Sequence, residues 1–397
     1  MTLTTAPTSA PPRPPRLKLA ADVRHLDFVL LGAALALSLI GAALVYSATH
    51  AKLQANGDDP RLFLNKVIIN IIVGMLLCWG VSTLGYRSLR ASAWWVYGAS
   101  VLLLVVVLTP LGTENNGTKG WLMLPAGFSL QPAELAKVGV ILAVSLVLTQ
   151  LGPSGAADSD VRPRSRYVVL ALIIAGVPML LILAQPDLGS VLLMIATVFG
   201  MLAVAGVSSR WLYGLAGLGI LTIAFALTSG ILEQYQIDRM TTFIHPDQDP
   251  LGAGYNTRMA RLAIAGGGLW GTGLFHGPTT QGGFVPYQQT DFVFSVAGEE
   301  LGVVGASVII LLVGVVLWRG IRIAKAAPDR YGRVMSAGVV TWIAVQAFEN
   351  IGMNLGIMPV TGVPLPFVSY GGSSMFALWV GIGLLTSVHL RTGRSVR

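Results

Sequence analysis

Long apolar stretches separated by short polar connections recur along nearly the whole chain of 397 residues. A helix needs about 20 apolar residues to cross a bilayer, and windows of that kind define the expected spans. They lie near 27–47, 64–84, 92–110, 132–150, 167–184, 187–206, 211–229, 291–318, 333–356 and 366–389. Helices satisfy their own backbone hydrogen bonds in lipid. The pattern therefore predicts an all-α polytopic membrane protein with ten transmembrane helices.

The composition agrees with this class, since 54% of the residues are hydrophobic and 11% are charged. A soluble domain has about 25% charged residues. Residues 1–26 are rich in Pro, Thr and Ala and lack the apolar core of a signal peptide, which is typical of a disordered tail. We expect this N-terminal tail, a membrane domain over 27–390 and a C-terminal tail over 391–397.

The net charge of +8 raises the question of nucleic acid, but the basic residues follow the membrane topology. With a cytoplasmic N-terminus, 18 of the 26 Lys and Arg residues fall in the tails and loops on the inside, as the positive-inside rule expects. We therefore expect both termini to be cytoplasmic and no nucleic-acid partner. Two long segments lie outside, 111–131 and the larger loop 230–290 between the seventh and eighth helices. Loops of that length are often functional.

Three acidic residues stand where predicted helices begin. Glu134 follows Pro132 in "QPAELAK", Asp187 lies in "QPDLGS", and Asp291 lies in "TDFVF". All three helices run from outside to inside, so the carboxylates converge at the outer surface. A helix N-terminus favours a negative charge by about 0.3–1 kcal/mol, which suits a general base or a cation ligand. The alternatives are helix capping by Asp187 or Asp291, and an ion pair of Glu134 with Lys137, three residues later.

Further acids lie deeper in the predicted spans. Glu299 and Glu300 follow Asp291 by two to three turns, and Glu349 lies within a polar stripe with a four-residue repeat. The stripe consists of Gln346, Asn350 and Asn354. Interhelical hydrogen bonds and the wall of a polar cavity both explain such a stripe. The five histidines have no metal-site spacing, and no nucleotide-binding signature occurs. The sequence therefore predicts no metal site.

Several stretches, in this order, are similar to the SEDS family (shape, elongation, division and sporulation), which includes RodA and FtsW. They are "NGTKGWLMLPAGFSLQPAELAK" (116–137), "QPDLGS" (185–190), "DRMTTFIHPDQDPLGAGYN" (238–256), "TDFVFSVAGEELG" (290–302) and "MPVTGVPLPFVSYGGSS" (358–374). Within the last of these, "PVTGVPLPF" resembles the RodA branch. Two places depart from the family pattern, Gly120 before the tryptophan and Met259-Ala260 after "GYN".

The resemblance implies a peptidoglycan glycosyltransferase that polymerises lipid II at the outer face of the bacterial cytoplasmic membrane. Asp291 matches the family's essential aspartate and is the expected general base. Arg239 matches the loop arginine and is the leading contact for the departing undecaprenyl pyrophosphate. A divalent cation is another source of positive charge there, and no other cofactor is expected. Further candidates for substrate binding are Lys119, Trp121, Glu134, Lys137, Asp187 and Ser369.

Each of these candidates keeps an alternative. Lys119 and Lys137 are candidates for the pyrophosphate contact, while Glu134 and Asp187 would line the cavity or position Lys137. Trp121 suits sugar stacking or anchoring at the membrane interface, and Ser369 suits the cavity wall or a close-packed turn.

The family implies several partners: the nascent glycan strand, a class B penicillin-binding protein, other elongation-complex proteins and membrane lipids. A lipid II flippase is the main alternative, since it shares ten spans and intramembrane acids. A scaffold for division or elongation proteins would need none of the acidic pattern.

Overall fold

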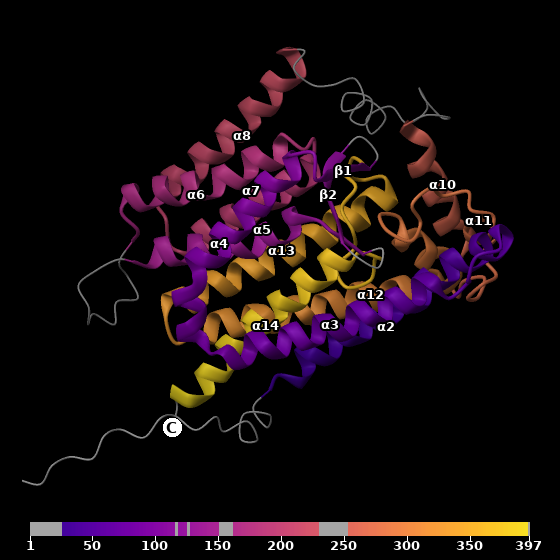
Figure 1. The fold of residues 1–397 in the computed structure, drawn as a ribbon, viewed down its shortest axis with the longest axis horizontal. Coiled ribbons are helices and arrows are strands. Elements are labelled where there is room, and N and C mark those ends of the chain that lie inside the picture. The colour runs from indigo at the N-terminus through magenta and orange to yellow at the C-terminus, as the bar shows by residue number, and fades with distance from the viewer. Residues whose placement is uncertain (1–25, 116–117, 125–127, 151–161, 230–252, 396–397) are drawn as a thin grey trace, which may run out of the picture.

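The computed structural model describes residues 26–115, 118–124, 128–150, 162–229 and 253–395. Most of its long helices run side by side along the long axis of the molecule (Figure 1). These helices are α2 (Phe28–Asn56), α3 (Leu62–Leu84), α4 (Tyr86–Leu108), α5 (Pro132–Thr149), α6 (Ser165–Leu183), α7 (Leu188–Val204), α8 (Ser209–Ser229), α12 (Val293–Ala326), α13 (Arg330–Leu355) and α14 (Gly372–Ser395). Each predicted span overlaps one of them.

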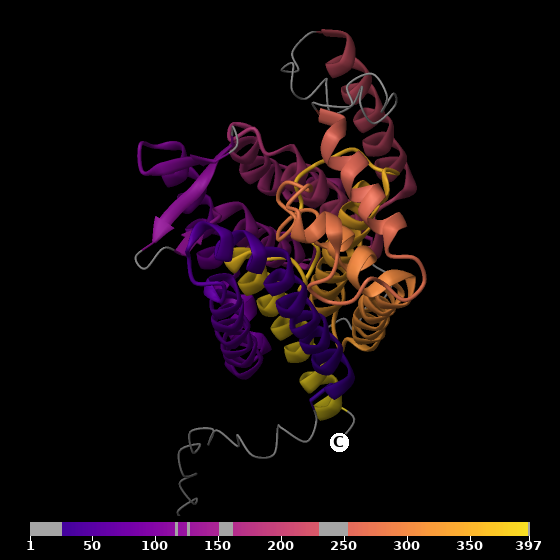
Figure 2. The same cartoon turned by 90° about the vertical axis from the view of Figure 1, so that its right-hand side faces the viewer.

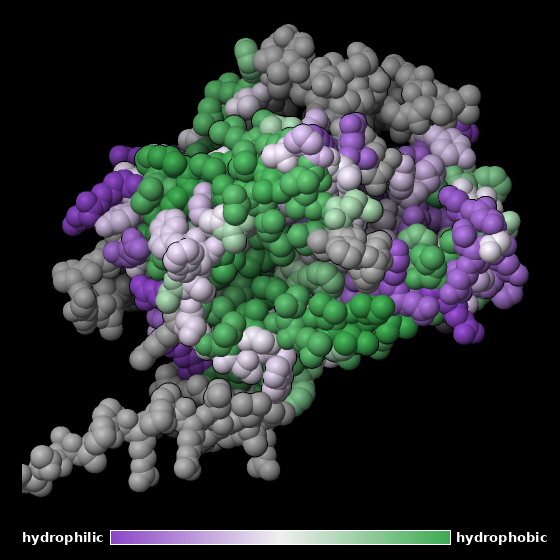
Figure 3. Space-filling model, in the orientation of Figure 1, coloured by the Kyte–Doolittle hydropathy of each residue, from purple (hydrophilic) through white to green (hydrophobic). Residues whose placement is uncertain are grey.

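Eight helices in the described part of the chain are long and apolar enough to cross a membrane, namely α2 to α6 and α12 to α14. Helix α7 is apolar but has 17 residues. On the face drawn in Figure 3, hydrophobic residues cover the middle of the molecule and hydrophilic residues gather towards its ends. The chain is therefore a multi-pass membrane protein. The count of ten spans and their orientation stay predictions.

Helix α5 forms the centre of the bundle, since almost every residue from Pro132 to Leu148 is buried. It packs against α4, α6, α7, α13 and α14. Small residues let neighbouring helices approach closely. At Gly74 of α3, for example, an added Cβ would lie 2.5 Å from the Trp379 ring of α14. The close packing around α5 encloses its polar side chains.

The prediction of an all-α fold was wrong for the segment 111–131. It contains a three-stranded antiparallel sheet of β1 (Gly112–Asn115), β2 (Thr118–Leu124) and β3 (Phe128–Leu130). Thr113 pairs with Trp121, and Leu122 pairs with Leu130. The sheet projects from one side of the bundle (Figure 2). The Asn-Gly dipeptide between β1 and β2, a typical hairpin signal, did not enter that prediction.

Helix α12 differs from the predicted straight span. Its 34 residues would extend about 50 Å at 1.5 Å per residue, well beyond a hydrocarbon core of about 30 Å. Gly302 breaks the helix with a φ of 65° and a ψ of −169°. Glu299 and Glu300 therefore lie in a short first piece, Val293 to Leu301, rather than within one continuous span.

The chain between α8 and α12 contains α10 (Ala253–Gly266) and α11 (Pro278–Gln281). These helices and residues 267–292 form one end of the molecule, here called the loop end (Figures 1 and 2). The C-terminus lies at the opposite end (Figure 1). The last predicted span began too early, because residues 366–368 form a turn and α14 starts at Gly372. Phe367 explains the delay, since its φ of 66° lies far from the negative φ of an α-helix.

Candidate active site

Asp291 lies at the loop end, in the turn that precedes α12, and is half-buried. Its backbone carbonyl accepts hydrogen bonds from Asn350 Nδ2 at 2.8 Å and Asn354 Nδ2 at 3.1 Å. The Asn350 amide also donates to the Val363 carbonyl at 2.7 Å. The polar stripe of α13 thus binds the backbone of the Asp291 turn. The sequence indicated this stripe through its four-residue repeat but not its partner.

A second set of contacts holds the same turn from the loop before α14. Ser369 Oγ donates to the carbonyl of Thr290 and accepts a hydrogen bond from the Leu365 amide at 2.8 Å. The Tyr370 amide donates to the Gln289 carbonyl at 2.9 Å. Burial raises the pKa of the Tyr370 hydroxyl. Ser369, a candidate from the sequence, is therefore next to Asp291.

The Asp291 carboxylate faces Gly362. A Cβ added to Gly362 would lie 3.7 Å from Asp291 Oδ2, and the glycine has a φ of 75°. One residue away, the Thr361 carbonyl packs against α7, since a Cβ on Gly189 would lie 2.7 Å from that oxygen. The segment Thr361–Val363 therefore joins Asp291 to the start of α7. Asp187 lies at that same helix end.

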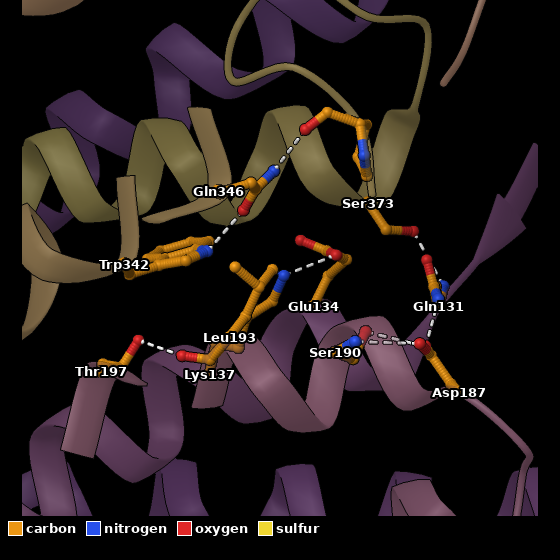
Figure 4. A network of polar contacts seen from close by, with 11 residues as sticks. Gln131, Glu134, Lys137, Asp187, Ser190, Leu193, Thr197, Trp342, Gln346 and Ser373 are labelled. Atoms are coloured by element: carbon orange, nitrogen blue, oxygen red, sulfur yellow. Dashed lines mark hydrogen bonds and ion pairs between the residues drawn. The ribbon is translucent and has the colours of Figure 1, made fainter. Parts of the chain in front are cut away.

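The predicted ion pair of Glu134 and Lys137 is confirmed, and it lies deep in the bundle (Figure 4). Lys137 Nζ is 2.7 Å from Glu134 Oε1, and the two side chains are 1% and 3% exposed. The ammonium also lies 5.2 Å from the centre of the Trp342 ring, within the range of a cation–π interaction. A charge buried this completely requires a partner, and the spacing on α5 supplies one.

Asp187 caps α7, which confirms the capping alternative. Its carboxylate accepts from the Ser190 amide at 2.9 Å and from Ser190 Oγ at 2.7 Å. The Gln131 side chain donates from Nε2 to this carboxylate at 3.3 Å, and the backbone N–H of Gln131 donates to Ser373 Oγ at 2.8 Å. These contacts, drawn in Figure 4, tie the N-terminal ends of α5, α7 and α14 together. The three helix starts therefore share one polar network.

Glu349 of α13 lies beside this network, and its carboxylate oxygens have no hydrogen-bond partner among the described residues. The candidate site residues from the sequence did not include it. The side chain is 3% exposed and lies within electrostatic reach of Lys137 and Asp187, with Thr361 beside it. Lys137 therefore lies near two acids, its partner Glu134 and Glu349. The polar stripe of α13 was the sequence signal for Glu349.

Other candidates lie apart from this network. Lys119 Nζ donates to the Leu108 carbonyl at 3.3 Å, at the C-terminal end of α4. Trp121 lies on β2, and its carbonyl accepts a hydrogen bond from Thr113 Oγ1 at 3.1 Å. Arg239 lies outside the described residues. The roles assigned to these three side chains stay predictions.

Among the described residues, no group of three or more His, Cys, Asp or Glu side chains is arranged to hold a metal ion. The acids near Asp291 and Lys137 instead bond to amides, hydroxyls and an ammonium. A role for a divalent cation therefore stays a prediction.

The fold and the site define a class: a multi-pass helical membrane protein whose polar network joins the ends of several helices. Residues 27–393 match the FtsW/RodA/SpoVE family, described as cell cycle proteins. The chain belongs to this family, as the sequence motifs predicted.

Individual relatives resemble the chain over nearly its full length. Peptidoglycan glycosyltransferase MrdB of Escherichia coli (strain K12) is 36% identical over 376 residues, which cover 94% of this chain and 96% of MrdB. Stage V sporulation protein E of Bacillus subtilis (strain 168) is 35% identical over 364 residues, which cover 91% of this chain and 96% of that protein. A chain of a solved peptidoglycan synthase complex, described as coordinating polymerization and crosslinking, matches with a TM-score of 0.74 and 32% identity. That match covers 92% of this chain and 98% of the other.

Proposed function

We propose that this protein is a peptidoglycan glycosyltransferase that polymerises lipid II during cell elongation. The observation that carries the proposal is the near-full-length similarity to MrdB, which is named for this activity. The placement of Asp291 supports it, since two segments far apart in the chain hold the turn before α12. The elongation role rests on the RodA-like "PVTGVPLPF" stretch.

The proposed orientation has ten spans, both termini in the cytoplasm, and the loop end on the outer side of the cytoplasmic membrane. The excess of Lys and Arg in the tails and the connections at the opposite end supports it. This orientation gives Asp291 access to lipid II that has already crossed the membrane.

In the proposed reaction, Asp291 removes the proton from the 4-hydroxyl of the acceptor GlcNAc. The hydroxyl oxygen then forms the new bond to the anomeric carbon of the donor sugar. The bond from that carbon to the pyrophosphate breaks, and undecaprenyl pyrophosphate leaves with the electron pair. A positioned base typically contributes about 10²–10⁴-fold to such a step. The turn that holds Asp291 supplies the positioning.

The leaving pyrophosphate needs positive charge. Arg239 remains the leading candidate from the sequence, with a divalent cation as another source. Lys137 is deeply buried and paired with Glu134. This burial favours a supporting role, in which the pair maintains the shape and charge of the polar network beneath Asp291. Lys119, Trp121 and Asp187 remain candidates with weaker support.

A class B penicillin-binding protein is the proposed partner, since it would crosslink the strands that this chain makes. The similarity to a chain of a complex that coordinates polymerization and crosslinking supports this partner. Other elongation-complex proteins would be neighbours in the membrane.

The test is a polymerisation assay with purified protein, the penicillin-binding partner and lipid II. We expect glycan polymer from wild type and from Asp58→Asn, a matched acid-to-amide change at an exposed site. We expect Asp291→Asn to lower the rate by about 10² or more without loss of lipid II binding. A wild-type rate for Asp291→Asn would refute the assignment of the base. Absence of polymer from wild type, with lipid II transfer between leaflets, would favour the flippase alternative.

A further inference from the structure

Glu299 and Glu300 are adjacent acids, each 1% exposed, at the end of the first piece of α12. Carboxylates are costly to bury unless hydrogen bonds replace water. The reaction proposed above uses neither of them. Their contacts show that they organise the segment 267–292, which leads to Asp291.

Glu299 binds the start of α11 with both oxygens. Its Oε1 accepts from the Thr279 amide at 2.8 Å, and its Oε2 accepts from the Thr280 amide at 2.8 Å. Thr280 Oγ1 also donates to Oε2, at 2.6 Å. Gly277 leaves room for this arrangement, because an added Cβ there would lie 2.7 Å from Glu299 Oε2. One carboxylate thus accepts hydrogen bonds from three donors, and the two on Thr280 are buried.

Glu300 accepts hydrogen bonds from both α2 and the segment 267–292. Its Oε1 accepts from Ser47 Oγ at 2.7 Å, from Gln281 Nε2 at 3.0 Å and from the Phe275 amide at 3.2 Å. The Gln281 amide group also reaches the Ser47 carbonyl at 3.2 Å. Glu300 therefore attaches the segment to α2, whereas Glu299 shapes α11 itself.

The buried side chain of Gln288 connects α11 to the Asp291 turn. Gln288 Nε2 donates to the Thr280 carbonyl at 3.0 Å and to the Ala48 carbonyl at 2.6 Å. The amide of Thr290 then bonds to the Tyr287 carbonyl at 3.0 Å and closes the turn. Thr280, which Glu299 holds, is thus one hydrogen bond from Gln288, a residue of this turn.

The backbone at Tyr287 shows why the turn needs support. Tyr287 has a φ of 55°, a left-handed conformation that bulky residues rarely adopt. Such a conformation persists only where the surrounding structure imposes it. The neighbouring residue, Gln288, supplies that constraint through Thr280, and Glu299 fixes the position of Thr280.

We infer that Glu299 is a positioning residue for Asp291, acting through Thr280 and Gln288. The inference rests on the proposed function, since it assigns Glu299 to the same reaction. Glu299 does not contact the reacting groups in this account. Its carboxylate sets the geometry of the turn from which Asp291 reaches the acceptor hydroxyl.

The first test compares the kinetics of Glu299→Gln and Thr280→Val with wild type. A misplacement of about 1 Å can lower a rate by about 10²-fold. We therefore expect kcat of Glu299→Gln to fall by about that factor, with a smaller fall for Thr280→Val, while KM for lipid II changes little. The matched control is Thr272→Val, since Thr272 Oγ1 donates to the backbone carbonyl of Glu299 at 3.1 Å and not to its carboxylate. We expect this control to keep the wild-type kcat.

A double-mutant cycle tests whether the two residues act together. Thr280→Val should lower kcat less in the Glu299→Gln background than in wild type. Additive losses would overturn the inference, as would a wild-type kcat for Glu299→Gln. Thr280→Val removes one hydroxyl donor and keeps the carboxylate, so it tests the same path if Glu299→Gln does not fold.

Hydrogen exchange provides a readout that does not depend on turnover. In Glu299→Gln, the amides of Thr279, Thr280 and the Asp291 turn should exchange faster than in wild type, while Asp291→Asn should leave the Thr279 and Thr280 amides unchanged. Unchanged exchange in Glu299→Gln would overturn the inference. Failure of the proposed function has a different signature, which is an inactive wild type. Failure of the inference alone leaves wild type active, Asp291→Asn inactive and Glu299→Gln fully active.

Discussion

Lys137→Met tests how strongly the buried pair of α5 contributes to the fold. The substitution keeps the apolar stem and removes the ammonium, which leaves the Glu134 carboxylate buried without its ion-pair partner. Lys137 Nζ donates to Glu134 Oε1 at 2.7 Å, while Glu134 Oε2 has no hydrogen-bond partner among the described residues. Loss of the lysine therefore removes the main source of compensation for this charge.

Removing one partner of a buried ion pair typically costs about 3–5 kcal/mol. The cation–π contact with Trp342, 5.2 Å from Nζ to the ring centre, adds about 0.5–1 kcal/mol or more. We therefore expect Lys137→Met to lower the free energy of unfolding by several kcal/mol. Replacement of both partners, Glu134→Gln with Lys137→Met, removes the charges together and should cost less than Lys137→Met alone.

The assay is reversible unfolding in mixed micelles, with the free energy measured by titration with a denaturing detergent. The comparison needs wild type, both single variants and the double variant under one set of conditions. An exposed pair contributes about 0–1 kcal/mol. A loss of that size for Lys137→Met, or additive losses in the double variant, would refute the reasoning that the pair is fully desolvated.

Three further substitutions have outcomes set by the structure. Gly302→Ala should destabilise the protein by at least about 1–3 kcal/mol because of the left-handed φ of 65°. The control Gly314→Ala should leave the stability unchanged, since an added Cβ there meets nothing within 4 Å. Equal melting temperatures for the two variants would contradict this. Asp27→Asn keeps the cap of α2 but loses the ion pair with Arg319 at 2.6 Å. The free energy of unfolding should therefore fall by about 1.5–3 kcal/mol. An unchanged free energy in the detergent titration would show that the ion pair does not stabilise the fold. Lys119→Met should leave polymerisation close to wild type, because Nζ binds a carbonyl at the end of α4; a large loss of rate would support its candidacy as a phosphate contact.

Helix positions and local pairs were predictable from the sequence, because each depends on residues close together in the chain. Apolar stretches form helices in lipid because a helix satisfies its own backbone hydrogen bonds there, and every predicted span overlaps a helix. Pro132 begins α5 and Asp187 caps α7. Glu134 and Lys137 share a helix face at a separation of three residues.

The surroundings of Asp291 depended on tertiary structure. Asn350 and Asn354 bind its carbonyl from 59 and 63 residues away, and hydropathy periodicity carries no information on such pairings. The break at Gly302 also needed the fold, because the glycine meets the backbone of Gly271 and Leu269. Patterns of residues thus determined which helices form, because helix formation is local. Only the packed bundle decided which loops and side chains hold the aspartate, because those contacts join segments that the sequence keeps apart.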